Sequence, residues 1–431
     1  MPPKRNHRPK NNKQSISGPV SGAMADCILP QGIMFSIVTR LPVKSIHRFK
    51  CVCKPWLKLF SSPKFMKAHH TQLSQNPENQ SVMVYCFSEK NGNTMSLYRT
   101  ELNWENPNIL DHPFPKWLQP MDFVGGCNGL ICLSYPPLGQ WIELWNPALK
   151  KAKSLPSPKL KAVRPAMVSI GFGYDDESDD FKVVRIVSVD KEKKKKKISV
   201  GVEVYSVNSN SWKTINVGFQ FSVLETRNDV VVNEKNLYWV AKVDKDDDEN
   251  EVLLWFDVKK MKFKVVSLSS LNLDEEQVAF VDWKGAIAAL VCNSNDERVL
   301  SLDVWVFDDS REIWIKNRSF GSIELKVDRF LRCLKSGEIV GECPDGKLFV
   351  LDENNGSVKN EIVIDDSHKR SFEIYEYTES LAYVQGMKKW KEKIDFEGER
   401  KLADLYTFLH DFANRNELGD GPHEITFQLL K

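Results

Sequence analysis

The chain of 431 residues carries 60 Lys and Arg against 58 Asp and Glu, which gives a formal net charge of +2. This balance argues against a dedicated nucleic-acid-binding protein, because such proteins show a strong basic excess. A chain of this length can bury a large core, so neither a disulfide nor a metal ion is required to hold it together.

The nine cysteines are odd in number and scattered, unlike the paired spacings of secreted, disulfide-rich domains. No positively charged start followed by an apolar stretch marks a signal peptide. No run of about 18 apolar residues predicts a membrane span. We therefore expect reduced thiols, no membrane association, and a location in the cytoplasm, the nucleus or both.

Residues 1–26 form a basic tail that we expect to be disordered. The first 23 residues contain five Lys and Arg, no acid and almost no large apolar side chain, so they cannot repay the entropy of ordering. The cluster of Lys4, Arg5, Arg8 and Lys10 is either a nuclear address or part of a solvated tail.

Residues 27–70 are predicted to be helical. Apolar residues recur at helical spacing up to Leu41, and Pro42 stops that helix. Ser45 is a candidate cap for a second helix, in which Pro55 should cause an end or a kink near residue 54. A short third turn with Phe65 and Met66 follows. The unit has more apolar residues than about 45 residues can bury, so it needs a partner surface.

From about residue 80 to 385 the chain reads as short strands separated by turns. An internal repeat places an apolar or aromatic residue at the end of a strand, then a polar turn and a returning strand. The anchors of the repeat are Trp145, Tyr205, Phe256, Phe307 and Leu351, with a weaker earlier copy at Tyr98. Spacings near 40 to 50 residues are typical of four-stranded propeller blades.

We therefore predict a β-propeller of about six blades over residues 80–385, with a two-sheet sandwich as the alternative. The longest interval between anchors contains "DDESDD" (175–180) and "KEKKKKK" (191–197), which we interpret as loop insertions. The tryptophans in and beside strands are expected to pack between blades, with a ligand cage as the alternative. The C-terminal extension, 386–431, is predicted to contain an amphipathic helix near 399–416.

Several motifs suggest chemistry but lack the required spacing. Cys51, Cys53, His69 and His70 do not fit a zinc site, because helical residues two apart point about 200° from each other; we interpret them as core thiols and surface histidines. "GFGYDD" (171–176) is better explained as a turn between strands than as a phosphate loop. "DKDDDENE" (244–251) is better explained as a solvated loop than as a calcium site. We expect no catalytic residue, no metal and no cofactor.

Residues 29–70 resemble an F-box. The resemblance rests on Leu29-Pro30, on the run Arg40–Ser45, on Arg48–Lys54, and on Trp56 and Phe65. The remainder resembles the F-box-associated, kelch-like region of plant F-box proteins, including those of the S-locus group. The matching phrases are "GGCNGLICL" (125–133), "LWNPALKKAKSLP" (144–156), "GFGYDDESDDFKVVRI" (171–186), "EVYSVNSNSWKTI" (203–215), "NLYWVAK" (236–242), "WFDVKKMKFKVV" (255–266) and "DVWVFDD" (303–309).

The resemblance implies a non-catalytic subunit of an SCF-type (Skp–cullin–F-box) ubiquitin ligase. Its helices would bind a Skp-type adaptor, and through it a cullin-RING ligase, while its β domain would bind the target protein. The adaptor-binding residues implied by position are Leu29, Pro30, Ile33, Ile37, Leu41, Pro42, Val52 and Trp56. The target-binding residues stay unassigned, and the alternatives are a non-ligase interaction scaffold or a propeller enzyme with an axial site.

One position departs from the family pattern. F-boxes usually carry acidic residues just after the opening Leu-Pro, and this chain has Gln31 and Gly32 there. Losing an acid near a helix N-terminus and adding a glycine should weaken the first turn by roughly 1–2 kcal/mol. We therefore expect weaker adaptor binding, or an adaptor that is itself divergent.

Overall fold

The protein is described here from a computed structural model, which divides the chain into two compact units, residues 1–38 and 39–431. The residues that it describes are 30–88, 92–99, 104, 107–110, 112, 121–135, 139, 141–161, 167–190, 198–224, 231–233, 236–245, 248–271, 277–296, 299–364 and 370–389. The expected tail (1–26), most of the C-terminal extension with its helix (399–416), and the basic run 191–197 lie outside these residues.

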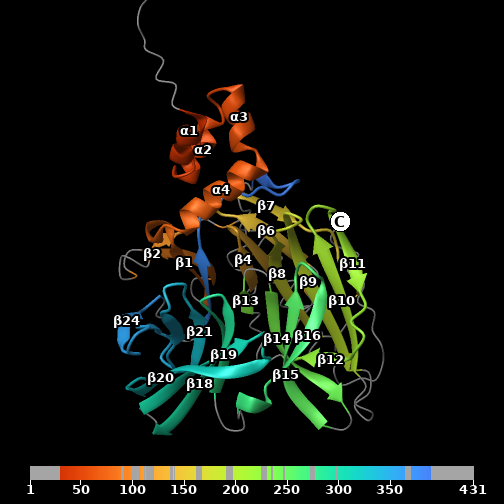
Figure 1. Cartoon of the computed structure of the whole chain (residues 1–431), viewed down its shortest axis with the longest axis vertical. Helices are drawn as coiled ribbons and strands as arrows, with labels where there is room; N and C mark the ends of the chain where they lie inside the picture. The colour runs from red at the N-terminus through yellow and green to blue at the C-terminus, as the bar shows by residue number, and fades with distance from the viewer. Residues whose placement is uncertain are drawn as a thin grey trace, which may run out of the picture. The chain divides into compact units, whose positions relative to one another are not determined.

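Among the described residues, four helices precede the strands (Figure 1). The first unit contains α1 (Gln31–Val38), and the second begins with α2 (Val43–Phe49), α3 (Lys54–Phe60), α4 (Pro63–Ser74) and the 3-10 turn η1 (Pro77–Asn79). Ser45 is not a cap, because α2 already begins at Val43 after Pro42. Pro55 lies in the first turn of α3 instead of ending a helix, a position where its missing N–H has no partner to lose.

The third helical segment is longer than the short turn that the sequence suggested. Pro63 opens α4, and the side chain of Ser62 accepts a hydrogen bond from the Phe65 amide at 3.3 Å. A serine in this position satisfies one of the free amides at the start of a helix. The helix therefore continues for 12 residues, to Ser74.

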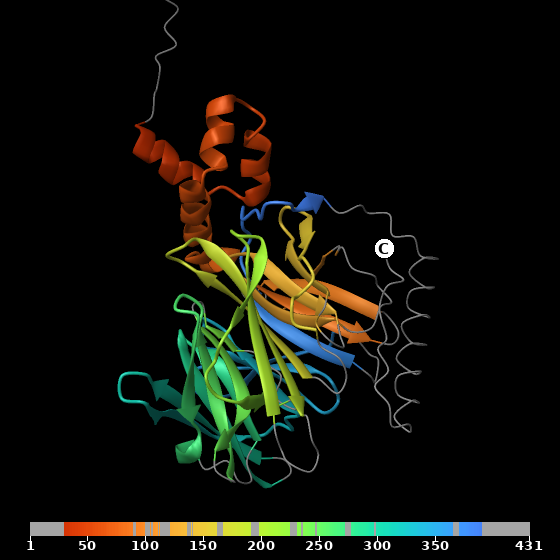
Figure 2. The same cartoon turned by 90° about the vertical axis from the view of Figure 1, so that its right-hand side faces the viewer.

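The rest of the second unit is a β-propeller whose described strands form six sheets, or blades (Figures 1 and 2). Blade I contains β25 (Arg370–Tyr377), β1 (Ser81–Ser88), β2 (Gly92–Arg99) and β3 (Asn108–Ile109); blade II contains β4 (Asp122–Cys127), β5 (Leu130–Tyr135), β6 (Trp141–Asn146), β7 (Lys151–Ser154) and β26 (Lys388–Lys389); and blade III contains β8 (Met167–Asp175), β9 (Asp180–Asp190), β10 (Ile198–Ser206) and β11 (Ser211–Ile215).

The other three blades follow in chain order. Blade IV contains β12 (Phe221–Val223), β13 (Val231–Asn233), β14 (Asn236–Lys245), β15 (Asp248–Asp257) and β16 (Lys262–Ser267), and η4 (Ser269–Leu271) follows it; blade V contains β17 (Gln277–Trp283), β18 (Ala286–Asp296), β19 (Val299–Asp308) and β20 (Ile313–Ile323); and blade VI contains β21 (Arg329–Cys333), β22 (Ile339–Glu342), β23 (Leu348–Leu351) and β24 (Val358–Ile362).

One strand from near the C-terminus closes the ring. β25 pairs with β1 over eight residues, from Ser81 opposite Tyr377 to Ser88 opposite Arg370. The first strands of the blades contact one another in the order β25, β4, β8, β13, β17 and β21, and β21 contacts β25 again. The first blade is therefore built from both ends of the domain, which makes the ring one closed unit.

The predicted repeat is confirmed at the level of single strands. All six anchors lie on the third strand of a blade, and all are buried: Tyr98 on β2, Trp145 on β6, Tyr205 on β10, Phe256 on β15, Phe307 on β19 and Leu351 on β23. A blade cannot bury both of its faces alone. Because this buried position recurs in every blade, the anchor residues recur along the sequence.

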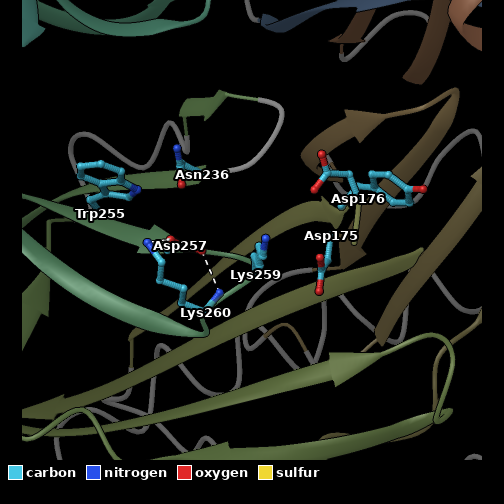
Figure 3. A pocket seen from close by; sticks show the side chains of 8 residues that line it. Asp175, Asp176, Asn236, Trp255, Asp257, Lys259 and Lys260 are labelled. Atoms are coloured by element: carbon cyan, nitrogen blue, oxygen red, sulfur yellow. Dashed lines mark hydrogen bonds and ion pairs between the residues drawn. The ribbon is translucent and has the colours of Figure 1, made fainter. Parts of the chain in front are cut away.

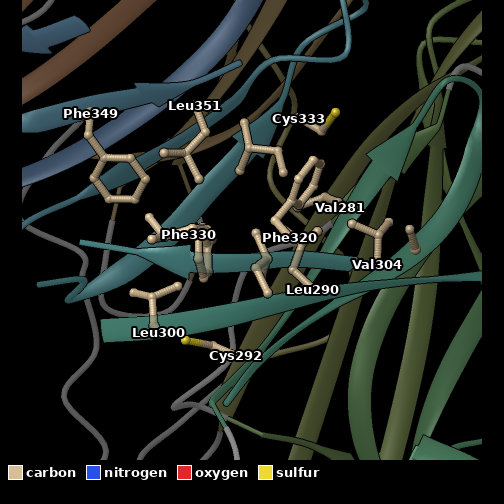
Figure 4. Close-up of a cluster of buried hydrophobic side chains, with 14 of the residues drawn as sticks. Val281, Leu290, Cys292, Leu300, Val304, Phe320, Phe330, Cys333, Phe349 and Leu351 are labelled. Atoms are coloured by element: carbon tan, nitrogen blue, oxygen red, sulfur yellow. The ribbon is translucent and has the colours of Figure 1, made fainter. Parts of the chain in front are cut away.

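Each contact between neighbouring blades has its own apolar cluster, and six such clusters join the six blades. Figure 4 shows the cluster between blades V and VI, to which Leu290 and Val304 of blade V and Phe330 and Phe349 of blade VI belong. The tryptophans lie in these contacts as expected: Trp212, Trp239 and Trp314 are buried. The glycine at 171 permits one such contact, because a Cβ there would lie 2.7 Å from the Trp239 ring.

Three loop interpretations were wrong. "GFGYDD" is mostly strand, since β8 continues to Asp175. "DDESDD" is not an insertion, because only residues 176–179 separate β8 from β9. The acids at its two ends are buried and bonded, with Asp175 accepting from Lys182 at 2.8 Å and Asp180 accepting from Ser206 at 2.6 Å. "DKDDDENE" contributes to both β14 and β15.

No helix among the described residues is long and apolar enough to cross a bilayer. Within the same residues, no group of three or more His, Cys, Asp or Glu side chains is placed to hold a metal ion.

Candidate functional site

A chain of aromatic contacts holds α2, α3 and α4 together. Ring centroids lie 5.3 Å apart for Phe49 and Trp56, 5.6 Å for Trp56 and Phe60, 5.0 Å for Phe60 and Phe65, and 5.8 Å for Phe65 and His69. Phe60 and Phe65 are fully buried. Because such pairs add to the free energy of burial, three short helices form a stable unit around them.

A buried histidine fixes the segment before α2. His69 Nε2 lies 2.7 Å from the Leu41 carbonyl oxygen, so it carries the proton and donates. Its Nδ1 is buried and has no hydrogen-bond partner. Burial lowers the pKa of His69, and the bond to Leu41 opposes this only in part. The ring is therefore neutral near pH 7, and its protonation would place an unpaired charge in the core.

The interpretation of this region as core thiols and surface histidines was wrong. His69 is fully buried, whereas Cys51 and Cys53 are both exposed. The reason is local: residues 50–53 form the connection between α2 and α3, and a connection of this kind lies on the surface. The two thiols are therefore accessible to solvent.

The described helices also expose large apolar side chains. On α1, Ile33 and Ile37 are about half exposed, at 50% and 48%. In the second unit, Val52 is 65% exposed and Leu57 is 49% exposed. These side chains are not needed for the aromatic core, so they are free to contact another polypeptide.

The residues that the sequence assigned to adaptor binding have different environments. Pro30, Ile33, Ile37, Pro42 and Val52 are exposed, while Leu41 and Trp56 are half-buried. Leu29 lies outside the described residues. Leu57 is exposed but is not among the assigned residues. In "KPWLKLF" it stands beside Trp56 but off the stripe that Phe60 continues.

The helices carry charge of one sign. From residue 27 to residue 77 the sequence contains no Asp or Glu, and it contains eight Lys and Arg: Arg40, Lys44, Arg48, Lys50, Lys54, Lys58, Lys64 and Lys67. The whole chain has a net charge of only +2. The helical segment is therefore a local concentration of positive charge, which favours a partner with an acidic surface.

The propeller has a cavity of about 370 Å³ between blades III and IV (Figure 3). Its lining residues are Tyr174, Asp175, Asp176, Asn236, Trp255, Asp257, Lys259 and Lys260. Lys260 Nζ lies 3.1 Å from the Asp257 carboxylate, and Lys259 pairs with Glu177. The cavity therefore offers an aromatic wall and polar groups to a peptide, and its lysines are already neutralised.

Asp175, which lines this cavity, has a structural role. Burial acts to raise the pKa of Asp175, but the hydrogen bonds from Lys182 and Ser178 outweigh it and hold the pKa below its usual range. Lys182 also donates to the Val258 carbonyl at 3.0 Å, so it links blade III to blade IV. Asp175 is thus a permanent anion that anchors Lys182, and it cannot act as a proton donor near pH 7.

Two family models match the chain: the F-box domain over residues 27–68, and the F-box associated beta propeller domain over residues 80–351. The chain is a plant F-box protein. It is 26% identical to F-box protein CPR1 of Arabidopsis thaliana over 312 residues, covering 67% of this chain and 72% of that one. It is 27% identical to an F-box/kelch-repeat protein of the same plant over 253 residues, covering 55% and 64% of the two chains.

This F-box protein departs from its family at the start of α1. The helix begins at Gln31 and has no acid in its first turn. A Cβ added at Gly32 would meet no atom within 4 Å, so the glycine is not required for packing. We therefore expect a weaker N-terminal turn of α1, with no compensating contact from Gly32.

Proposed function

We propose that this F-box protein is the substrate-recognition subunit of an SCF-type ubiquitin ligase. Its F-box would bind a Skp-type adaptor and, through it, a cullin-RING ligase. Its propeller would hold the target protein. The chain itself makes and breaks no bond: it raises the effective concentration of the target's lysines near the charged conjugating enzyme.

This proposal rests on large apolar side chains that remain exposed on helices that already have a core. Val52 and Leu57 project from α2–α3, although Phe60 and Phe65 fill the interior. The absence of acids from residues 27–77 supports the same assignment, because it gives the helices one sign of charge to steer a partner. Ile33 and Ile37 on α1 would add to the contact.

Co-purification of the full chain with a Skp-type adaptor tests the proposal, and the structure offers a matched control. Val52 and Val363 are 65% and 64% exposed, so Val52→Asp and Val363→Asp make the same change on the helices and on blade VI. Placing a carboxylate in an apolar interface should cost at least ~2 kcal/mol, or ~30-fold in Kd. Val363→Asp should bind like the wild type.

Leu57→Asp is a second test, because it is independent of Val52. Trp56→Ala is less informative, since Trp56 packs on Phe49 and Phe60 and its loss would also disturb the helices. The assignment is wrong if the wild-type chain does not bind the adaptor, or if both aspartate variants bind it unchanged.

A non-ligase scaffold is the alternative function, and the weakened first turn of α1 favours it. A reconstituted ligase separates the two. The receptor role predicts adaptor-dependent transfer of ubiquitin to a protein bound by the propeller, and the scaffold role predicts binding without transfer.

A further inference from the structure

The outer edge of blade II places like charges opposite each other. β26 pairs with β7, and Lys389 lies directly opposite Lys151. In antiparallel pairs, directly opposite Cα atoms are ~4.5–5.5 Å apart and their side chains share one face. Like charges in such positions repel and destabilise the pairing. In the free protein, this edge therefore carries an electrostatic strain that an anion would relieve.

Two further groups belong to the same face. Lys153 lies two residues after Lys151 on β7, so it projects to the same side. Lys153 Nζ donates to Asn210 Oδ1 at 2.7 Å, which orients it without neutralising it. Lys151 Nζ lies 4.6 Å from the centre of the exposed Tyr383 ring. The face combines three cations with one aromatic surface.

Several lysines of the other blades differ, because acids neutralise them. Ion pairs join Lys264 to Asp309 at 2.8 Å, Lys316 to Asp303 at 2.7 Å, Lys347 to Asp345 at 3.0 Å and Lys284 to Glu353 at 2.8 Å. Within the described part of the chain, no carboxylate lies within ion-pair distance of Lys151, Lys153 or Lys389. The three lysines of this edge therefore differ from these four, which already have acid partners.

The surroundings oppose the positive charge of this group. Burial lowers the pKa of Lys153. Burial, followed by the charge of Lys151, also lowers the pKa of Lys50 at the end of α2. Local arrangements that cost stability are found most often at functional sites. A group of lysines without acid partners beside an exposed aromatic ring therefore favours a binding role.

We propose that the face formed by Lys151, Lys153, Lys389 and Tyr383, here called the blade II basic face, binds a segment rich in Asp and Glu on a partner protein. Residues two apart on a strand are ~6.8 Å apart, which matches alternate side chains of an extended peptide. A single exposed tyrosine does not provide the successive stacking surfaces that single-stranded nucleic acids use. The inference rests on the proposed function, within which this partner is the target.

A peptide-binding experiment with the full chain tests this. The probe is a fluorescein-labelled peptide of about twelve residues that alternates Glu and Ser, with a Gln-for-Glu peptide as its control. The test variant is Lys151→Gln/Lys153→Gln/Lys389→Gln. The matched control is Lys264→Gln/Lys316→Gln/Lys347→Gln, which removes the same charge from lysines that already have acid partners. A third variant, with Arg at positions 151, 153 and 389, keeps the charge.

The test variant should bind the Glu peptide at least about tenfold more weakly than the wild type, while the matched control and the Arg variant change less than about twofold. Affinity should fall as NaCl rises from ~50 to ~300 mM, because salt screens exposed charges. The test variant should melt no lower than the wild type, since it removes a repulsion. Equal losses in test and control variants, or equal binding of the Gln peptide, would overturn the proposal.

Two competition measurements keep this proposal separate from the ligase function. An oligonucleotide that displaces the peptide and binds more tightly would overturn the assignment to an acidic protein segment. Displacement of the peptide by a saturating Skp-type adaptor would show that the face binds the adaptor and not the target. If the adaptor binds but the peptide does not, the basic-face proposal alone fails; if the peptide binds but the adaptor does not, the ligase proposal fails.

Discussion

Replacing Glu203 by glutamine tests the buried ion pair that holds blade III to the segment before it. Glu203 Oε1 accepts from Arg185 at 2.7 Å, and both side chains are completely buried. Glu203 Oε2 accepts from the amides of Lys159 and Leu160 at 2.8 and 3.1 Å. Arg185 also donates to the Leu160 carbonyl at 2.8 Å. One carboxylate therefore fixes two strands and the chain that joins blades II and III.

The expected loss follows from this geometry. A glutamine oxygen can accept on only one side, so its NH2 would face either Arg185 or the two amides. The guanidinium would also lose its counter-charge. Burial lowers the pKa of Arg185, and the hydrogen bond and charge of Glu203 act to raise it. Removing one partner of a buried pair costs ~3–5 kcal/mol. At ~2–4 °C per kcal/mol, Tm should fall by ~6–20 °C.

Thermal unfolding followed by circular dichroism measures this effect. The control is Asp309→Asn, which removes the partner of Lys264 in a pair whose side chains are 38% and 59% exposed; the expected loss there is below ~1 kcal/mol. A Tm for Glu203→Gln within ~2 °C of the wild type would refute the argument that burial makes this pair indispensable.

Three further predictions concern the helices and the closure of the ring. Gln31→Asp/Gly32→Ala should strengthen the first turn of α1 by ~1–2 kcal/mol and tighten adaptor binding by up to ~30-fold in calorimetric titration; unchanged or weaker binding would contradict this. Because burial lowers the pKa of His69 below the ordinary 6.5, the unfolded chain takes up more protons below pH 6.5. Stability should therefore fall as the pH drops through this value, by at most ~1.4 kcal/mol per pH unit for this residue, and His69→Gln should reduce the slope in urea titrations. Phe372→Ala on β25 removes a fully buried ring and should cost ~3–5 kcal/mol in one cooperative transition; a separate early transition of blade I would show that β25 does not close the ring as a unit.

The propeller was predictable because each blade repeats one buried position. An aromatic or large apolar residue on the third strand recurs from Tyr98 to Leu351, and stacking of blades imposes the same environment on each copy. The closing strand was not predictable in this way. "RSFEIYEY" pairs with β1, almost 300 residues earlier, and a local pattern contains no information about such a distant partner.

The exposed apolar side chains of the helices were predicted in part. Exposed Ile33, Ile37 and Val52 belong to the assigned residues. Leu57 does not, because it lies off the apolar stripe that the sequence pattern marks. The burial of His69 could have been predicted: Phe65, His69 and Leu73 recur every four residues along α4, and all three are buried. The hydrogen-bond partner of His69, the Leu41 carbonyl, lies 28 residues away, and a local pattern contains no information about such a distant partner.

We propose that the helices, and not the propeller, bind the adaptor. Hydrogen–deuterium exchange of the full chain with and without a Skp-type adaptor measures this directly. We expect slower exchange in residues 31–60 and unchanged exchange in blades IV to VI. Binding of the adaptor with protection confined to the blades, and none in α1, α2 or α3, would contradict it.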